Sequence, residues 1–100
     1  MRRQHLLNFY DNDYGVYMRK YLVDIYLPAS GKHYDAYLPA EKRIGEVTLL
    51  LIDIVNSMTG GSYKETADAR LLYADNGKPL NLNDTVYDAG IRNSTKLILI

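Results

Sequence analysis

The chain has 100 residues and contains no cysteine, no tryptophan and only one phenylalanine. Without cysteine, it cannot form a disulfide, a zinc–thiolate site or a thiol nucleophile. It also lacks an excess of charge of either sign, because twelve basic residues balance twelve acidic ones. Strong binding to nucleic acid depends on positive charge that neutralises phosphates, so we expect no nucleic-acid partner.

Long apolar runs are absent as well. The basic pair Arg2-Arg3 is followed by no segment long enough to be a signal-peptide core or a membrane span. We therefore expect a soluble, cytoplasmic protein without direct membrane insertion. Its hydrophobic content of 47% and charged content of 24% are ordinary for a globular protein. The length suits a single domain.

Tyrosine is the abundant aromatic residue, with ten copies. Tyrosine favours strands, where its ring packs and its hydroxyl stays in water, and it is also enriched at protein interfaces. The composition alone leaves both interpretations open.

The N-terminal part of the chain differs from the rest. The stretch from Asn8 to Gly15 is rich in turn-forming residues and has no clear apolar period. We interpret residues 1–19 as a mobile N-terminal extension, with a docked short helix as the alternative, and residues 20–100 as the folded domain. Met18 also leaves open that translation starts after residue 17.

A β-hairpin is predicted next. The segments 21–27 and 33–38 alternate between apolar and polar residues, which is typical of half-buried strands. The intervening residues 28–32 carry proline and glycine and predict a turn. The side chains expected to face inward are Val23, Ile25, Leu27, Tyr34, Ala36 and Leu38.

The clearest pattern in the chain predicts an amphipathic helix that ends at Gly60-Gly61. Its start carries no good N-cap residue. The apolar residues at helical spacing are Ile44, Val47, Leu50, Leu51, Ile54, Val55 and Met58, and Leu49 and Ile52 broaden this face.

Shorter elements complete the chain. They are a strand over 69–74, an Asn76-Gly77 turn into a very short strand over 78–80, one helical turn over 86–89 ended by Gly90, and a last strand over 95–100. A hairpin, a long helix and then further strands follow one another in the order of an α+β β-grasp fold. We predict a mixed sheet of four to five strands with one long helix packed across it.

From Tyr21 to the end, the spacing of these elements resembles ubiquitin. Within that superfamily, the chain is most similar to the bacterial YukD/EsaB proteins, which are ubiquitin-like accessories of type VII (WXG100/ESX) secretion. The segments that carry the resemblance are Val23-Asp-Ile-Tyr-Leu-Pro28, Tyr37-Leu-Pro39 and Val86-Tyr-Asp-Ala-Gly-Ile91. The resemblance implies a non-conjugated protein-binding module with a regulatory or accessory role, whose partner is a membrane component of the secretion system, such as its ATPase.

One departure from ubiquitin bears on function. Conjugated modifiers and sulfur carriers need a flexible tail that ends in Gly-Gly, whereas Ile100 lies within the predicted last strand. We therefore expect no conjugation. Two alternatives stay open: a modifier or sulfur carrier whose Gly-Gly tail is missing from these 100 residues, and an adaptor domain of a larger protein.

No residue pattern predicts an enzyme, a metal site or a cofactor. The two histidines, His5 and His33, are not in any paired-ligand motif, and no serine lies in a nucleophile elbow. We interpret His33 and Asp35, which share a strand face, as a solvated pair.

The period of two along the strands predicts a binding surface. The resemblance to ubiquitin assigns Leu71, Leu97 and Leu99 to the core. The alternating residues Leu72, Ile98 and Ile100 should then face outward, as an apolar surface for a protein partner. The alternative is that the N-terminal extension folds back over this surface.

Overall fold

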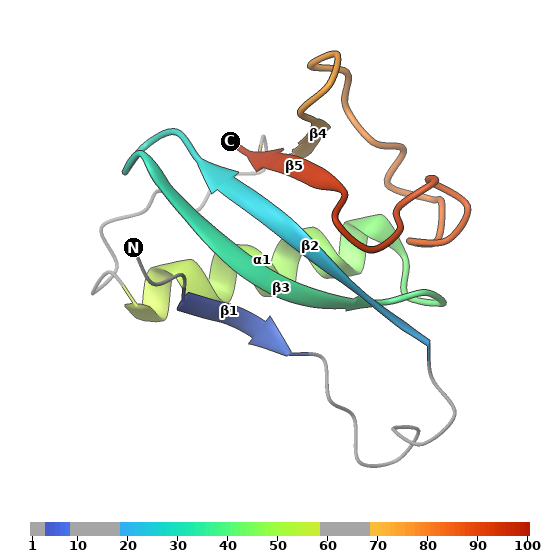
Figure 1. Cartoon of the computed structure of the whole chain (residues 1–100), viewed down its shortest axis with the longest axis horizontal. Helices are drawn as coiled ribbons and strands as arrows, with labels where there is room; N and C mark the ends of the chain where they lie inside the picture. The colour runs from blue at the N-terminus through green and yellow to red at the C-terminus, as the bar shows by residue number, and fades with distance from the viewer. Residues whose placement is uncertain (1–3, 9–18, 59–68) are drawn as a thin grey trace.

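The computed structural model describes residues 4–8, 19–58 and 69–100 (Figure 1). Only the backbone of residues 4–8 is described. The elements are β1 (Gln4–Asn8), β2 (Lys20–Leu27), β3 (Lys32–Pro39), α1 (Ile44–Met58), β4 (Leu71–Tyr73) and β5 (Lys96–Leu99).

The strands form one mixed sheet in the order β1-β3-β2-β5-β4. β2 and β3 form the predicted antiparallel hairpin, β5 lies parallel to β2 near the centre, and β4 pairs antiparallel with β5. The helix α1 crosses one face of this sheet (Figure 1). The predicted α+β β-grasp fold, with one long helix across a mixed sheet, is confirmed.

β1 was not predicted. It pairs parallel with β3 at one edge of the sheet, from Gln4 opposite Tyr34 to Asn8 opposite Tyr37, with a register shift between His5 and Leu7. An edge strand exposes backbone N–H and C=O groups that a further strand can satisfy. Residues 4–8, which were predicted to belong to a mobile extension or a docked short helix, form this strand. Residues 9–18 lie outside the described part, so a separate N-terminal extension stays a prediction.

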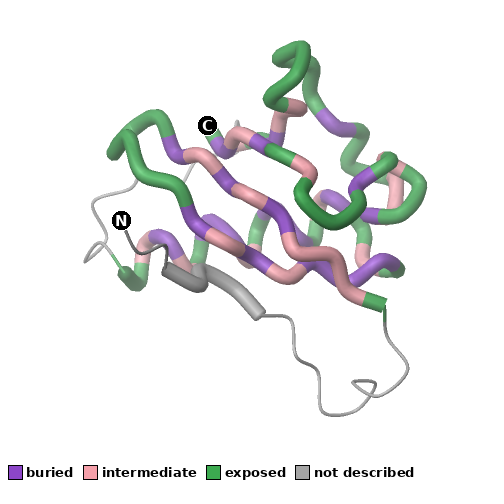
Figure 2. Tube along the Cα trace, in the orientation of Figure 1, coloured by how far each residue is buried: buried purple, intermediate pink, exposed green. Residues whose placement is uncertain are grey.

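The core lies between α1 and the inner face of the sheet (Figure 2). The period of two along the strands is confirmed, since every side chain predicted to face inward from the sheet is at most 5% exposed. The buried strand residues are Val23, Ile25, Leu27, Tyr34, Ala36, Leu38, Pro39, Leu71, Leu97 and Leu99.

The buried face of α1 is rotated from the predicted one. Leu49 is 70% exposed and Met58 is 45% exposed, and Leu50 and Ile54 are only half-buried. Apolar residues occur almost all round this helix, so their spacing alone does not select one face. The helix residues that are buried are Ile44, Val47, Thr48, Leu51, Ile52 and Val55. The polar residue among them satisfies its hydroxyl by donating to the Ile44 carbonyl at 2.8 Å.

The start of α1 is capped by backbone rather than by a side chain. The N–H groups of Ile44 and Gly45 donate to the carbonyls of Asp84 and Leu82, at 2.8 and 3.0 Å. This explains a helix start without an N-cap residue.

The loops after β4 follow the prediction in outline. At the Asn76-Gly77 turn, Gly77 has a φ of 70°, and the predicted short strand is reduced to a bridge between Leu72 and Pro79. Residues 86–90 form turns, and the Thr85 hydroxyl accepts a hydrogen bond from the Asp88 N–H at 3.0 Å. The predicted Gly60-Gly61 cap lies outside the described residues.

Candidate protein-binding surface

The face of the sheet opposite α1 carries a row of side chains that crosses four strands. Leu72 of β4 lies opposite Ile98 of β5, and Ile98 lies opposite Tyr26 of β2. Tyr26 in turn lies opposite His33 of β3, and the centres of these two rings are 4.6 Å apart. We call Leu72, Ile98, Tyr26 and Ile100 the outer apolar surface.

The three predicted binding residues all lie on this surface. Leu72 and Ile98 are half-buried, and Ile100 is 49% exposed. Ile100 is held by backbone hydrogen bonds that it exchanges with Arg70, at 2.9 and 3.1 Å. Their predicted outward orientation is thus confirmed, while a role in binding stays a prediction. Tyr26 was not predicted as part of this surface, and the parallel pairing of β2 and β5 brings it beside Ile98.

A row of charged residues borders the outer apolar surface. Two residues before Tyr26 in β2, Asp24 lies opposite both Lys96 of β5 and Asp35 of β3. His33 reaches diagonally to Asp24, with Nδ1 at 3.0 and 3.1 Å from its two carboxylate oxygens. The histidine is therefore bonded to a residue on the neighbouring strand, whereas the sequence predicts a solvated pair with Asp35. Only the strand register could have revealed this partner.

β1 does not cover the outer apolar surface. In the strand order, β1 lies at one edge and β4 at the other, with three strands between them. The described part of the N-terminal extension is therefore far from Leu72 and Ile98. The alternative in which the N-terminal extension folds back over this surface also involves residues 9–18. These residues lie outside the described part of the chain.

Within residues 19–58 and 69–100, no group of three acidic or histidine side chains is placed to hold a metal ion. No helix in the described part of the chain is long and apolar enough to cross a membrane.

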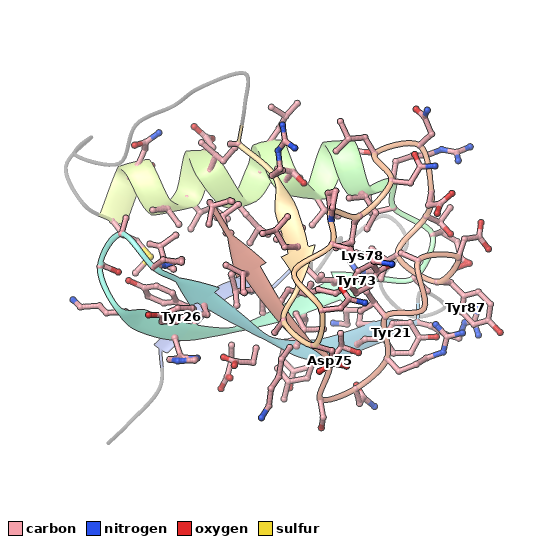
Figure 3. The ribbon with its side chains drawn as sticks, turned by 90° about the horizontal axis from the view of Figure 1, so that it is seen from above. Tyr21, Tyr26, Tyr73, Asp75, Lys78 and Tyr87 are labelled. Carbon is pink, nitrogen blue, oxygen red and sulfur yellow. The ribbon has the colours of Figure 1, made fainter. Side chains whose placement is uncertain are left out.

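Tyr73 ties β4 to the loop that follows. Its hydroxyl donates a hydrogen bond to the Ala89 carbonyl. Burial raises the pKa of the Tyr73 phenol above its ordinary value of 10.0, and the negative charge of Asp84 raises it further. The neutral phenol, which can donate, is thus the form that the folded state favours. Figure 3 shows Tyr73 beside Lys78 and far from Tyr26.

We expect Tyr73→Phe to lower the free energy of unfolding by about 1 kcal/mol at pH 7, because this hydrogen bond is lost. The difference between wild type and variant should persist up to about pH 10 and shrink as the pH rises through the raised pKa, since a phenolate cannot donate. Urea denaturation of both proteins at pH 7 and about pH 11 measures this. An equal difference at both pH values would show that the hydroxyl does not act as a donor.

Comparison with known proteins found matches among solved structures only. No family model matches the chain, and no curated protein sequence matches it. The ubiquitin-like domain of EccD5 from Mycobacterium xenopi superposes with a TM-score of 0.67 at 20% identity, over 82% of this chain and 93% of that one. The ubiquitin-like domain of the Mycobacterium tuberculosis type VII secretion protein EccD1 gives 0.66 at 20% identity, over 83% and 99%.

A third match is part of an assembly. A chain of the MycP5-free ESX-5 inner membrane complex superposes with a TM-score of 0.68 at 20% identity, over 81% of this chain but only 20% of that chain. At this level of identity, the three likenesses establish the fold and nothing finer. The fold is that of ubiquitin-like domains.

Proposed function

We propose that this chain is a non-conjugated ubiquitin-like module that binds a protein component of a bacterial type VII secretion system through its outer apolar surface. The proposal assigns it a regulatory or accessory role at the cytoplasmic face of the membrane, and no catalytic step.

The observation that carries the proposal is the row formed by Leu72, Ile98 and Tyr26. The helix α1 covers one face of the sheet. No other described element packs over the opposite face, where this row lies. A contiguous apolar surface on a small domain is most often a site for a protein partner. Tyrosine suits such a site, because its large ring packs at little cost in conformational entropy.

The neighbouring structures support the choice of secretion system. Two of them are ubiquitin-like domains of EccD proteins, and a third is a chain of an ESX-5 inner membrane complex. A membrane component of such a machine is therefore the partner we propose. The resemblance to YukD/EsaB, which rests on short sequence segments, supports the same assignment.

A second candidate function has an observation of its own. The matched chain of the ESX-5 complex is about five times longer than the region that this protein covers, since the coverage is 20%. These 100 residues could thus correspond to one domain of a larger membrane-associated protein. Coding sequence that extends the domain without a Gly-Gly terminus would support this candidate, and a Gly-Gly terminus would support a modifier or sulfur carrier.

Replacing Leu72 by aspartate should abolish partner recovery while lowering the melting temperature by no more than a few degrees, since Leu72 lies outside the core. The measurement is an affinity pulldown from lysate of the native cells, with detergent-solubilised membranes included, read by mass spectrometry. Leu49→Asp is the matched control, because Leu49 is an exposed leucine on α1.

Recovery of secretion-system membrane proteins by wild type and by Leu49→Asp, but not by Leu72→Asp, would support both the function and the surface. Recovery of an adenylating enzyme, or of this domain joined covalently to other proteins, would overturn the non-conjugated assignment. A large loss of melting temperature in Leu72→Asp would show that Leu72 belongs to the core.

A further inference from the structure

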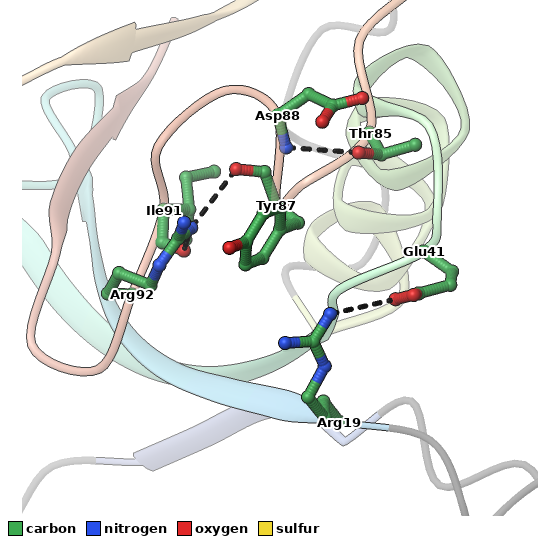
Figure 4. A network of polar contacts seen from close by, with 7 residues as sticks. All are labelled: Arg19, Glu41, Thr85, Tyr87, Asp88, Ile91 and Arg92. Atoms are coloured by element: carbon green, nitrogen blue, oxygen red, sulfur yellow. Dashed lines mark hydrogen bonds and ion pairs between the residues drawn. The ribbon is translucent and has the colours of Figure 1, made fainter.

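A second surface lies where the loop after β4 meets the start of β2. The guanidinium of Arg92 lies 3.8 Å from the centre of the Tyr87 ring, and that of Arg19 lies 4.8 Å from the same centre. Arg92 also lies 5.4 Å from the centre of the Tyr21 ring. Figure 4 shows both arginines beside Tyr87. We call Arg19, Tyr87 and Arg92 the arginine site.

The arginine site is separate from the outer apolar surface. Tyr21 lies on the α1 side of β2 and packs against the core, so Arg92 contacts the opposite side of the strand from Tyr26. Figure 3 shows Tyr21 and Tyr87 together at one end of the molecule, with Tyr26 at the other. A partner could therefore contact both surfaces independently.

Arg92 is held in place by its own loop. Its Nη1 atom donates to the carbonyls of Tyr87 and Ile91, at 3.0 and 2.7 Å. Among the described residues, the side-chain hydrogen bonds of Arg92 all use Nη1, so the donors on Nε and Nη2 are available on an exposed side chain. A guanidinium fixed in this way loses little conformational entropy when it binds a carboxylate.

Arg19 has a contact that a ligand can replace. Its Nη2 atom lies 3.8 Å from a Glu41 carboxylate oxygen, and both side chains are more than half exposed, at 60% and 63%. An exposed ion pair of this length contributes little to stability. A carboxylate that approaches with two parallel hydrogen bonds would therefore displace Glu41.

We propose that the arginine site binds an acidic segment of a protein partner, with one aspartate or glutamate on Arg19 and another on Arg92. Tyr87 supports both guanidiniums through cation–π contacts. Charge complementarity identifies the occupant as acidic, and the proposal rests on the proposed function only in taking that occupant to be a protein.

The test is a titration of the ¹⁵N-labelled chain with a hexaglutamate peptide, followed by NMR. We expect saturable shifts of the Arg19, Tyr87 and Arg92 signals at low salt, and their loss near 1 M salt, where charges are screened within about 3 Å. Arg19→Gln should weaken peptide binding about tenfold, as expected for a lost charge-assisted hydrogen bond. Arg70→Gln, which removes an exposed arginine beside Ile100 and outside the arginine site, should leave it unchanged.

Three results would overturn the proposal: no saturable shift at the arginine site, equal weakening by Arg70→Gln and Arg19→Gln, or binding to vesicles of anionic lipid without binding to the peptide. Leu72→Asp should bind hexaglutamate like wild type. Failure of the arginine site is thus distinguishable from failure of the outer apolar surface, which only the pulldown measures.

Discussion

Replacing Leu97 by alanine should lower the free energy of unfolding by about 3 kcal/mol, within the range of 2–5 kcal/mol usual for buried leucines. Leu97 is fully buried in β5 and lies between Ile25 of β2 and Tyr73 of β4. A central strand with neighbours on both sides cannot shift to close the cavity, so the loss includes both the transfer of the methyl groups and the empty volume. Urea denaturation measures it as a lower midpoint.

The matched control is Ile98→Ala on the same strand. Ile98 is half-buried on the outer face, so its truncation should cost about 1 kcal/mol or less. A one-residue slip of β5 would exchange the two side chains between the faces. Equal losses in the two variants, or a larger loss for Ile98→Ala, would therefore contradict the register on which the outer apolar surface depends.

The inward-facing side chains of the sheet could be predicted from the sequence, because alternate residues of a strand face opposite sides and only one of these two sets can face the core. For Val23, Ile25 and Leu27, apolar residues alternate with more polar ones, and the choice follows directly. In β5 every residue after Lys96 is apolar, and the resemblance to ubiquitin was needed to decide that Leu97 and Leu99 face inward. The same decision placed Ile98 on the outer face.

The polar contacts of the two surfaces could not be predicted, because they depend on the register of the strands and on the path of a loop. The bond between His33 and Asp24 depends on the hairpin register. The arginine site depends on how residues 86–92 fold back towards Arg19, and no periodicity encodes that path. β1 was missed for a similar reason, since a short strand at a sheet edge is stabilised by the strand it joins rather than by its own pattern.

The helix shows where spacing alone fails. Leu49, Leu50 and Leu51 follow one another in α1, and Ile52 and Ile54 come soon after. With apolar residues at so many positions, several overlapping stripes satisfy the rule of three and four. Packing against the sheet decides which of these stripes is buried. The buried residues of α1 form one cluster with the inward-facing side chains of β2, β3 and β5. Leu51 is buried in this way, whereas Leu49 is exposed to solvent.

Leu51→Ala should therefore lower the free energy of unfolding by about 3 kcal/mol, while Leu49→Ala changes it by less than about 0.5 kcal/mol. Both substitutions replace leucine by the best helix former, so helix propensity affects them alike and only burial separates them. Urea denaturation of the two variants beside wild type measures the difference. A marked loss in Leu49→Ala would mean that Leu49 is covered by something outside the described residues, and it would disqualify Leu49→Asp as a control for the partner pulldown.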